Sequence, residues 1–329
     1  MKIAVAVLVA ALLCGCASPG RFEFALIGDQ QYDAESDAQF PRLMADIDRA
    51  EVEFVVHLGD FKPGVSLPCD DKLFESRRQQ FNASRHPLIY TPGDNDWTDC
   101  HNPKAGGYVP EERLASLRRI LFADRQSLGR RKLELEQQPD FPENLRWRRG
   151  NILFLTLHIV GSNNNLGRTP EGDAEYGNRM AANVAWIRDA FALAKRDNAA
   201  AVAIFTQANP RFERSFPGGR VTALGVGPVP KAPSGYADFL PELEKEVLGY
   251  GKPVLFLHGD THYFRVDKPL FRSGVFGGGD RGRQIENFTR VEVHGFPESH
   301  WVRIAVDPRE PVVFSFKEQI VEANRYQKR

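Results

Sequence analysis

Four short apolar segments of this sequence each run directly into the dipeptide Gly-Asp, and this repeated ending constrains the fold more than any other feature. The pairs are Phe22–Ile27 with Gly28-Asp29, Phe54–Leu58 with Gly59-Asp60, Leu88–Pro92 with Gly93-Asp94, and Val254–His258 with Gly259-Asp260. Short apolar segments that end in turn residues are typical of buried strands. The glycine allows a sharp turn, and the aspartate places a short carboxylate at the end of the strand. Because ligands of open α/β sheets bind beyond these strand ends, we expect the four carboxylates to gather at one edge.

Amphipathic stretches alternate with the apolar segments, and this alternation is typical of an α/β domain. Two sets of apolar residues recur at helical spacing: Phe40, Leu43, Met44 and Ile47, then Met180, Val184, Ile187, Phe191 and Ala194. Further strands are expected at Ile152–Leu157, Ala201–Phe205, Phe288–Val293, Trp301–Val306 and Val312–Phe316. No long helical pattern separates the last three, so we expect them to form an antiparallel portion that completes a second sheet.

The charge balance argues against a nucleic-acid partner. The 329-residue chain has 43 Lys plus Arg and 43 Asp plus Glu residues, whereas proteins that bind nucleic acids usually carry a basic excess. The sequence also lacks the GxSxG, HExxH and Walker A motifs of serine hydrolases, zinc proteases and P-loop nucleotide-binding proteins. We therefore expect none of these activities.

The N-terminus has the pattern of a bacterial export signal. Met1-Lys2 precedes an apolar run from Ile3 to Leu13, which is too short to span a bilayer of about 30 Å but suits a signal peptide. The run ends in Leu13-Cys14-Gly15-Cys16-Ala17, which resembles a lipobox with Cys16 as the lipidated residue; an ordinary secretory leader is the alternative. We expect a lipoprotein signal peptide at residues 1–15 and one domain at 16–329. This predicts a lipid-anchored, periplasm-facing protein of the bacterial envelope, on the outer rather than the inner membrane.

Two cysteines, Cys69 and Cys100, remain in the expected mature chain. Metal ligation by the pair is one interpretation, but neither cysteine belongs to a CxxC motif. In an oxidising compartment an even pair favours a disulfide, which contributes about 3 kcal/mol in the chain-entropy model. We therefore expect a Cys69–Cys100 disulfide.

The gathering of four carboxylates predicts a metal site. A single Gly-Asp pair is a common turn, but four that end buried strands point to a shared role. Carboxylates held at one sheet edge repel one another strongly unless cations bind between them. We therefore expect Asp29, Asp60, Asp94 and Asp260 to bind divalent metal.

Five blocks of the sequence resemble, in order, the signature blocks of the calcineurin-like metallophosphoesterases. That family's pattern runs DxH, GDxxD, GNH(D/E), a lone histidine after a strand, and GHxH. The blocks here are Gly28-Asp29-Gln30-Gln31, Gly59-Asp60, Gly93-Asp94-Asn95-Asp96, Thr206-Gln207-Ala208-Asn209-Pro210 and Gly259-Asp260-Thr261-His262. The resemblance implies a four-layer α/β/β/α sandwich of two mixed β-sheets flanked by helices.

The resemblance also implies a site for two divalent metal ions. The implied ligands are Asp60 as the bridge, Asp29, Gln31 and His262 at the first ion, and Asp94, Gln207 and Asp260 at the second. Such a site would hydrolyse a phosphate mono- or diester of a small molecule, with metal-bound hydroxide as the nucleophile. Because most of these ligands are oxygen atoms, we expect manganese or magnesium, with calcium as the next choice, rather than zinc or iron.

Several positions depart from the family pattern. Gln31 and Gln207 stand where the family has histidines. Asp94 replaces an asparagine, and Asp260 replaces a histidine. Asn95 replaces the histidine beside the substrate phosphate, and an amide cannot protonate a leaving group. General-acid assistance of about 10²- to 10⁴-fold would then be lost, so we expect a weakened enzyme unless another group supplies the proton.

Other residues are candidates for the catalytic machinery. Asp96 is the acidic residue that ends the third block, and His158 follows the strand Ile152–Leu157. His158 is a candidate for the missing acid, and the alternative is a hydrogen-bonded core histidine. Arg168, Arg179 and Arg211 are candidates for contacting a phosphate, with ordinary surface contacts as the alternative.

These features leave three hypotheses for the function. The first is a metal-dependent phosphoesterase. The second is a catalytically impaired metal-binding or scaffold lipoprotein of the envelope, which Asn95, Gln31 and Gln207 favour. The third is an envelope protein that binds a partner through the Gly- and Pro-rich segment Pro210–Pro233, because loops of that length are usually functional or mobile.

Overall fold

The computed structural model describes residues 20–212, 233–273 and 281–325. The expected signal peptide at 1–15, the lipid-bearing Cys16 and most of the segment Pro210–Pro233 lie outside these residues, so the leader, the anchor and the contact loop stay predictions. None of the described helices is long and apolar enough to cross a membrane.

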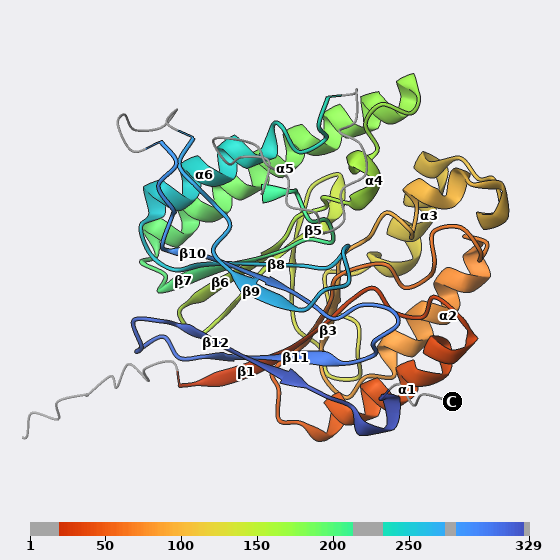
Figure 1. The fold of residues 1–329 in the computed structure, drawn as a ribbon, viewed down its shortest axis with the longest axis horizontal. Coiled ribbons are helices and arrows are strands. Elements are labelled where there is room, and N and C mark those ends of the chain that lie inside the picture. Colours follow the sequence, from red (N-terminus) through yellow and green to blue (C-terminus); the bar gives the residue numbers. More distant parts are fainter. Residues whose placement is uncertain (1–19, 213–232, 274–280, 326–329) are drawn as a thin grey trace, which may run out of the picture.

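In the described residues, two mixed β-sheets pack together between layers of helices (Figure 1), so the α/β class and the two flanked sheets are confirmed. The five-stranded sheet has the order β12-β11-β1-β2-β3, and the seven-stranded sheet has the order β4-β5-β6-β7-β8-β10-β9. The strands of the first are β1 (Phe22–Ile27), β2 (Val55–His57), β3 (Leu88–Tyr90), β11 (Trp301–Val306) and β12 (Phe314–Gln319). Those of the second are β4 (Glu136–Gln138), β5 (Phe141–Arg149), β6 (Ile152–Thr156), β7 (Ala201–Phe205), β8 (Val254–His258), β9 (Arg265–Asp267) and β10 (Phe288–Glu292).

Helices cover the outer faces of both sheets (Figure 1). On the side of the five-stranded sheet lie α1 (Ala34–Arg49) and α2 (Asp71–Asn82), and on the other side lie α5 (Pro170–Arg196) and α6 (Phe239–Tyr250). The short segment α4 (Gly161–Asn164) has left-handed backbone angles and is a turn. The helix α3 (Pro110–Leu121) packs against α2 and against the short 3-10 helix η1 (Thr98–His101). The apolar stripes expected at helical spacing lie in α1 and α5.

Aromatic side chains fill the interface between the two sheets. Phe24 of β1 stacks on Phe54 with ring centroids 4.9 Å apart. Its edge contacts reach Phe154 and Phe205 of the facing sheet, each at 5.9 Å. Such aromatic pairs contribute about 0.5–1.5 kcal/mol each beyond the burial of their surface. These contacts therefore pack β1 of the first sheet against β6 and β7 of the second.

The expected antiparallel portion near the C-terminus was wrong in part. β11 and β12 do extend the first sheet in antiparallel fashion from β1. β10, in contrast, pairs in parallel with β8 in the other sheet, with Phe288 opposite Val254. β12 also begins at Phe314 rather than at Val312, whose side chain is 77% exposed. The last strands therefore divide between the two sheets instead of completing one.

The expected disulfide between Cys69 and Cys100 is present. Both residues are completely buried, and they are 31 positions apart in the chain. The bond ties the segment that follows Gly59-Asp60 to η1, which follows the third Gly-Asp block. It therefore joins two of the loops that begin at strand ends.

Candidate functional site

The strand ends of both sheets meet at one edge of the sandwich. The backbone N–H of Asp29, after β1, donates to the carbonyl of Gly59 at 3.0 Å. In the other sheet, the N–H of Gly259 donates to the carbonyl of Gln207 at 3.0 Å. The N–H of Asp260 then donates to the carboxylate of Asp29 at 3.1 Å. This last bond crosses between the sheets, so the edge is built from residues of both.

Five residues at this edge hold a left-handed backbone conformation that non-glycine residues rarely adopt. Their φ angles are 52° at Asp29, 66° at Gln31, 57° at Asp60, 80° at Asp260 and 65° at His262. Each such residue costs about 1–3 kcal/mol and persists only where the surrounding structure enforces it. Conformations of this kind concentrate at functional sites, and here all five lie in three of the segments that follow strand ends.

Asp60 accepts hydrogen bonds from three uncharged donors. Its Oδ1 atom accepts from the backbone N–H of Asn95 at 3.1 Å. Its Oδ2 atom accepts from the Tyr32 hydroxyl at 3.0 Å and from Nε2 of Gln207 at 3.2 Å. The side-chain amide of Asn95 in turn donates to the Tyr32 hydroxyl at 2.9 Å. Asp60 thus lies at the centre of the site, with its charge opposed by no cation among these contacts.

Tyr32 was missed by the sequence analysis, although it follows the first signature block directly. Its ring stacks on Phe296 with centroids 5.5 Å apart and meets His262 edge-on at 5.3 Å. Burial, followed by the charges of Asp60 and Asp29, raises the pKa of Tyr32 well above its ordinary value, so the phenol stays protonated. The hydroxyl therefore acts as a hydrogen-bond donor to Asp60.

Asp96, a predicted catalytic residue, lies beneath the site and is completely buried. Its Oδ2 atom accepts from the backbone N–H groups of Asp60 and Gly93 at 2.9 and 2.8 Å and from the Tyr90 hydroxyl at 2.7 Å. Its Oδ1 atom accepts from the N–H of Phe61 at 3.0 Å. These bonds fasten the loops after β2 and β3 together, which positions Asp60.

The carboxylates of Asp94 and Asp260 lie on the side of the site that Gln207 occupies. Oδ2 of Asp94 accepts from the Ser162 hydroxyl at 2.8 Å, whereas its buried Oδ1 has no hydrogen-bond partner among the described residues. Oδ2 of Asp260 accepts from the backbone N–H of Asn209 at 3.0 Å, and the side chain of Gln207 also bonds to Asp260. Asp94 therefore presents one free oxygen to the site.

The carboxylates at this edge interact strongly with one another. Burial first, and then repulsion from neighbouring carboxylates, raises the pKa values of Asp29, Asp60 and Asp94 well above the ordinary range. Burial also raises the pKa of Asp260 to about 6. In the described part of the chain, no Lys or Arg side chain forms an ion pair with these four residues. The cluster therefore favours either protons or a bound cation.

His262 faces Asp29 with a nitrogen that carries no proton. Its Nδ1 atom lies 2.8 Å from the carbonyl oxygen of Phe296, which can only accept, so the ring proton resides on Nδ1. Its Nε2 atom lies 3.7 Å from Oδ1 of Asp29. Burial lowers the pKa of His262, which favours the neutral ring. Two electron-pair donors therefore face each other across a short distance.

The side-chain N–H groups of Gln31 are directed to the helices, whereas its buried Oε1 has no hydrogen-bond partner among the described residues. Its Nε2 atom donates to Asp37 of α1 at 2.8 Å and to Gln80 of α2 at 3.1 Å. In the described residues, no three His, Cys, Asp or Glu side chains form a group that could hold a metal ion as they stand. The acceptor atoms of Asp29, Asp60 and His262 are suitable for a cation, whereas the two glutamines present N–H groups to their neighbours.

Glu292 is a second residue that the sequence analysis missed. This completely buried side chain ends β10 and accepts from both the N–H and the hydroxyl of Thr261, which lies between Asp260 and His262. Arg265 donates to it from Nε at 2.6 Å. Burial raises the pKa of Glu292 to about 7 in spite of Arg265. The sequence offered little signal for this positioning role, because β10 also contains Thr289 and Arg290.

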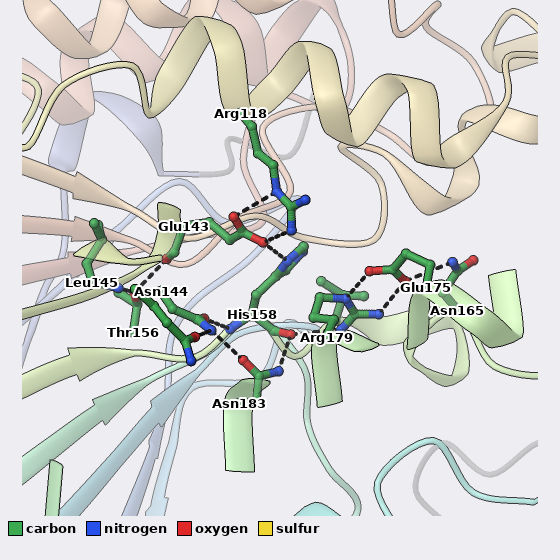
Figure 2. Close-up of polar contacts among 12 residues, drawn as sticks. Arg118, Glu143, Asn144, Leu145, Thr156, His158, Asn165, Glu175, Arg179 and Asn183 are labelled. Atoms are coloured by element: carbon green, nitrogen blue, oxygen red, sulfur yellow. Dashed lines mark hydrogen bonds and ion pairs between the residues drawn. The ribbon is translucent and has the colours of Figure 1, made fainter. Parts of the chain in front are cut away.

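His158 lies in a buried hydrogen-bond network with Glu143 and Arg179 (Figure 2). Its Nδ1 atom is 2.7 Å from Oε1 of Glu143, which also forms a two-point ion pair with Arg118. The carbonyl of His158 accepts from Arg179 at 2.8 Å. These contacts favour the interpretation of His158 as a core histidine over the interpretation as a catalytic acid.

Arg179 is also accounted for within this network. Its guanidinium is completely buried and donates to the carboxylate of Glu175 (Figure 2). It donates also to the side chain and the carbonyl of Asn164. Arg168 donates to the carbonyl of Thr98 at 2.7 Å and is only partly exposed. The interpretation of Arg179 as a phosphate contact was wrong, because its donors are used inside the protein.

Comparison with known proteins gives little similarity in sequence. No protein-family model matches the chain, and no curated protein matches it. Among solved structures, the chain is similar to GAP50, the anchor in the inner membrane complex of Plasmodium, with 10% identity and a TM-score of 0.46 over 92% of this chain and 90% of that one. It is similar also to TT1561 of Thermus thermophilus, with 11% identity and a TM-score of 0.44 over 92% and 99%. Likeness at this level carries no conclusion about function.

Proposed function

We propose that this protein is a phosphoester hydrolase that depends on a divalent cation, and that its two flanked sheets are the four-layer sandwich of the calcineurin-like metallophosphoesterases. The observation that carries the proposal is the pair formed by His262 and Asp29. The unprotonated Nε2 of the imidazole lies 3.7 Å from a carboxylate oxygen, with its own proton held by the carbonyl of Phe296. Two such acceptors repel each other unless a cation or a proton lies between them.

The chemistry of the surrounding side chains supports a hard cation at this position. Asp29 and Asp60 are buried, and their hydrogen bonds come from neutral donors such as Tyr32. Aspartate oxygens and one imidazole suit manganese or magnesium. Because these side chains do not yet form a coordinating group, we propose that Asp29, Asp60 and His262 close on the ion when it binds. When bound, a divalent cation of this kind polarises a phosphate ester and favours attack by water.

The residues around Asp60 determine which esters the site can cleave. Asn95 holds Tyr32 through a 2.9 Å hydrogen bond, and neither side chain is a strong acid at neutral pH. An alkoxide leaving group would therefore depart without a ready proton donor, whereas nitrophenolate needs none. We expect hydrolysis of aryl phosphates to be faster than hydrolysis of alkyl phosphates by a factor of about 10² or more.

The test is hydrolysis of p-nitrophenyl phosphate and of its bis-ester by the purified full-length chain, with Mn²⁺, Mg²⁺, Ca²⁺ or Zn²⁺ added. Asp60→Asn removes the central carboxylate charge, and the exposed Asp124→Asn serves as its matched control. We expect metal-dependent turnover that Asp60→Asn abolishes and Asp124→Asn preserves. Turnover that survives Asp60→Asn, or that needs no added metal after chelation, contradicts the proposal.

A scaffold without turnover is the second candidate function. Gln31 favours it, because this residue can offer a cation only an amide oxygen where the family pattern has an imidazole, and its N–H groups already bond to Asp37 and Gln80. The missing acid at Asn95 favours it as well. Calorimetric binding of Mn²⁺ by folded protein that hydrolyses neither ester would support this function over the enzyme.

A further inference from the structure

We propose that the site binds one divalent cation rather than two, because the side-chain amide of Gln207 donates hydrogen bonds where the second cation would bind. This inference rests on the proposed function, since it concerns the same site. It assigns the remaining cation to the side of Asp29 and His262, and it gives Asp94 and Asp260 hydrogen bonds in place of a metal.

The orientation of the Gln207 amide is fixed by one backbone group. The N–H of Gly161 lies 2.7 Å from the amide of Gln207, and a backbone N–H can only donate. The atom that faces it must therefore be the carbonyl oxygen, Oε1. The NH₂ group then points the other way, and its Nε2 atom donates to Oδ2 of Asp60 at 3.2 Å. Gln207 is completely buried, so water offers no alternative partner that would allow a flip.

An amide in this orientation offers a cation no electron pair on the side of Asp60. The NH₂ nitrogen has no available electron pair and presents its hydrogens to Asp60 and Asp260. One oxygen of each carboxylate on this side also has another donor, from Ser162 to Asp94 and from the N–H of Asn209 to Asp260, and Oδ1 of Asp94 is left without a partner among the described residues. The NH₂ group of Gln207 thus takes the place that a second ion would fill between Asp60 and Asp260.

The Gly161 anchor is itself held rigidly. The next four residues, Ser162, Asn163, Asn164 and Asn165, have φ angles of 47°, 55°, 57° and 69°, so they form a left-handed turn. The buried guanidinium of Arg179 donates to the carbonyl of Asn164 at 3.0 Å and to its side chain at 2.6 Å. A reversal of the Gln207 amide would require this turn to move, because the Gly161 N–H would lose its acceptor.

The opposite side of the site lacks such a donor. His262 has its ring proton on Nδ1, and Nε2 faces Asp29 without a hydrogen between them. Gln31 stands where the family pattern has a histidine. Its NH₂ group donates to Asp37 and Gln80 and not to Asp29. The two sides of the site therefore differ in their hydrogen bonding. Near Asp29, two acceptor atoms face each other, whereas near Gln207 an N–H donor faces the carboxylate of Asp60.

The experiment counts bound Mn²⁺ on the full-length chain by isothermal titration calorimetry and by electron paramagnetic resonance. An isolated Mn²⁺ gives a six-line spectrum, whereas two adjacent ions give a spin-coupled spectrum. Gln207→His replaces the donating amide with a ligand, and Gln207→Glu does so with a nearly isosteric side chain. Gln31→His is the matched control, because it makes the same substitution at the other glutamine.

We expect one ion and an isolated spectrum for the natural chain and for Gln31→His, and two ions with a coupled spectrum for at least one Gln207 variant. Two coupled ions in the natural chain would overturn the inference and leave the proposed function standing. One ion in both Gln207 variants, with circular dichroism that shows folded protein, would also overturn it. No bound ion in the natural chain, together with no turnover, would instead remove the proposed function itself.

Discussion

The Nε2 atom of His262 lies 3.7 Å from Oδ1 of Asp29, while the proton of the same ring is bonded to the carbonyl of Phe296. This arrangement pre-sets the tautomer that a metal ligand needs. It also joins the ends of β8 and β1, which belong to different sheets. The pair therefore brings one candidate metal ligand from each sheet close together.

The first prediction concerns this pair. His262→Ala removes the imidazole lone pair, and we expect the affinity for Mn²⁺ to fall by at least about tenfold, since changes beside a metal commonly cost 10- to 100-fold. Calorimetric titration measures the effect. His101→Ala, at an exposed histidine of η1, is the control and should leave the affinity unchanged. Equal loss in both variants would show that the histidine at position 262 has no special role.

The second prediction concerns Gly161. A Cβ atom at this position would lie 2.6 Å from Oδ1 of Asp94 and 2.7 Å from Oδ2, closer than a carbon can approach. Gly161→Ala should therefore displace the N–H that holds Gln207, lower the melting temperature and weaken Mn²⁺ binding. Gly177→Ala, in an open part of α5, is the control and should stabilise the protein slightly. A variant Gly161→Ala that melts and binds like the natural chain would contradict the anchor role.

The third prediction concerns the acid stability that Glu143 provides. Burial alone would raise the pKa of Glu143, but the hydrogen bonds and charges of His158 and Arg118 lower it from 4.5 to about 2. A carboxyl group whose pKa is lower in the folded state stabilises the folded protein at pH values above its unfolded-state pKa. This stabilisation is lost as the pH falls through the folded-state pKa. The contribution is about 3 kcal/mol above pH 4.5 and is lost between about pH 4.5 and 2.

Glu143→Gln should accordingly be less stable than the natural chain at pH 7 and should show a flatter decline between pH 4.5 and 2. Urea unfolding at several pH values measures this difference. The exposed Glu134→Gln is the control, because this side chain lies outside the buried network, and its curve should follow that of the natural chain. Parallel curves for the natural chain and Glu143→Gln would show that the buried network does not lower the pKa of Glu143 in the folded protein.

The fourth prediction concerns the Cys69–Cys100 disulfide. The bond closes a separation of 31 residues, so its loss should reduce the free energy of unfolding by about 3 kcal/mol. The double variant Cys69→Ser with Cys100→Ser should show this loss in urea and should not respond further to dithiothreitol. The natural chain should reach the same stability once reduced. A natural chain that keeps its full stability after complete reduction would contradict this contribution.

The strands that carry the site could be predicted from the sequence because each is a short, mainly apolar segment, and four of these segments end in Gly-Asp. β1 begins and ends where it was expected, and β7 does as well. The pairing of β10 could not be predicted, because its apolar pattern is the same whether it extends one sheet or the other. Its partner is chosen by contacts that join Phe288 to Val254, which lie far apart in the chain.

The directions of the site side chains were beyond sequence reasoning. Gln31 and Gln207 occupy equivalent places in the motif pattern, yet one bonds to helices and the other to Asp60. The difference arises from the partners available, since Gly161 offers a donor to Gln207 from a distant loop. Tyr32 and Glu292 were missed because their roles depend on hydrogen bonds to Asp60 and to Thr261 rather than on a motif.

The pairing of β1 has a consequence for the order in which the protein can be completed. β1 lies between β2, which follows it closely, and β11, whose Val306 lies opposite Phe22. A chain made from its N-terminus therefore presents one open edge of β1 until almost all other residues have been synthesised. An unpaired strand edge is a template for association with other chains. The strand that carries Asp29 is thus among the first to emerge and among the last to be enclosed.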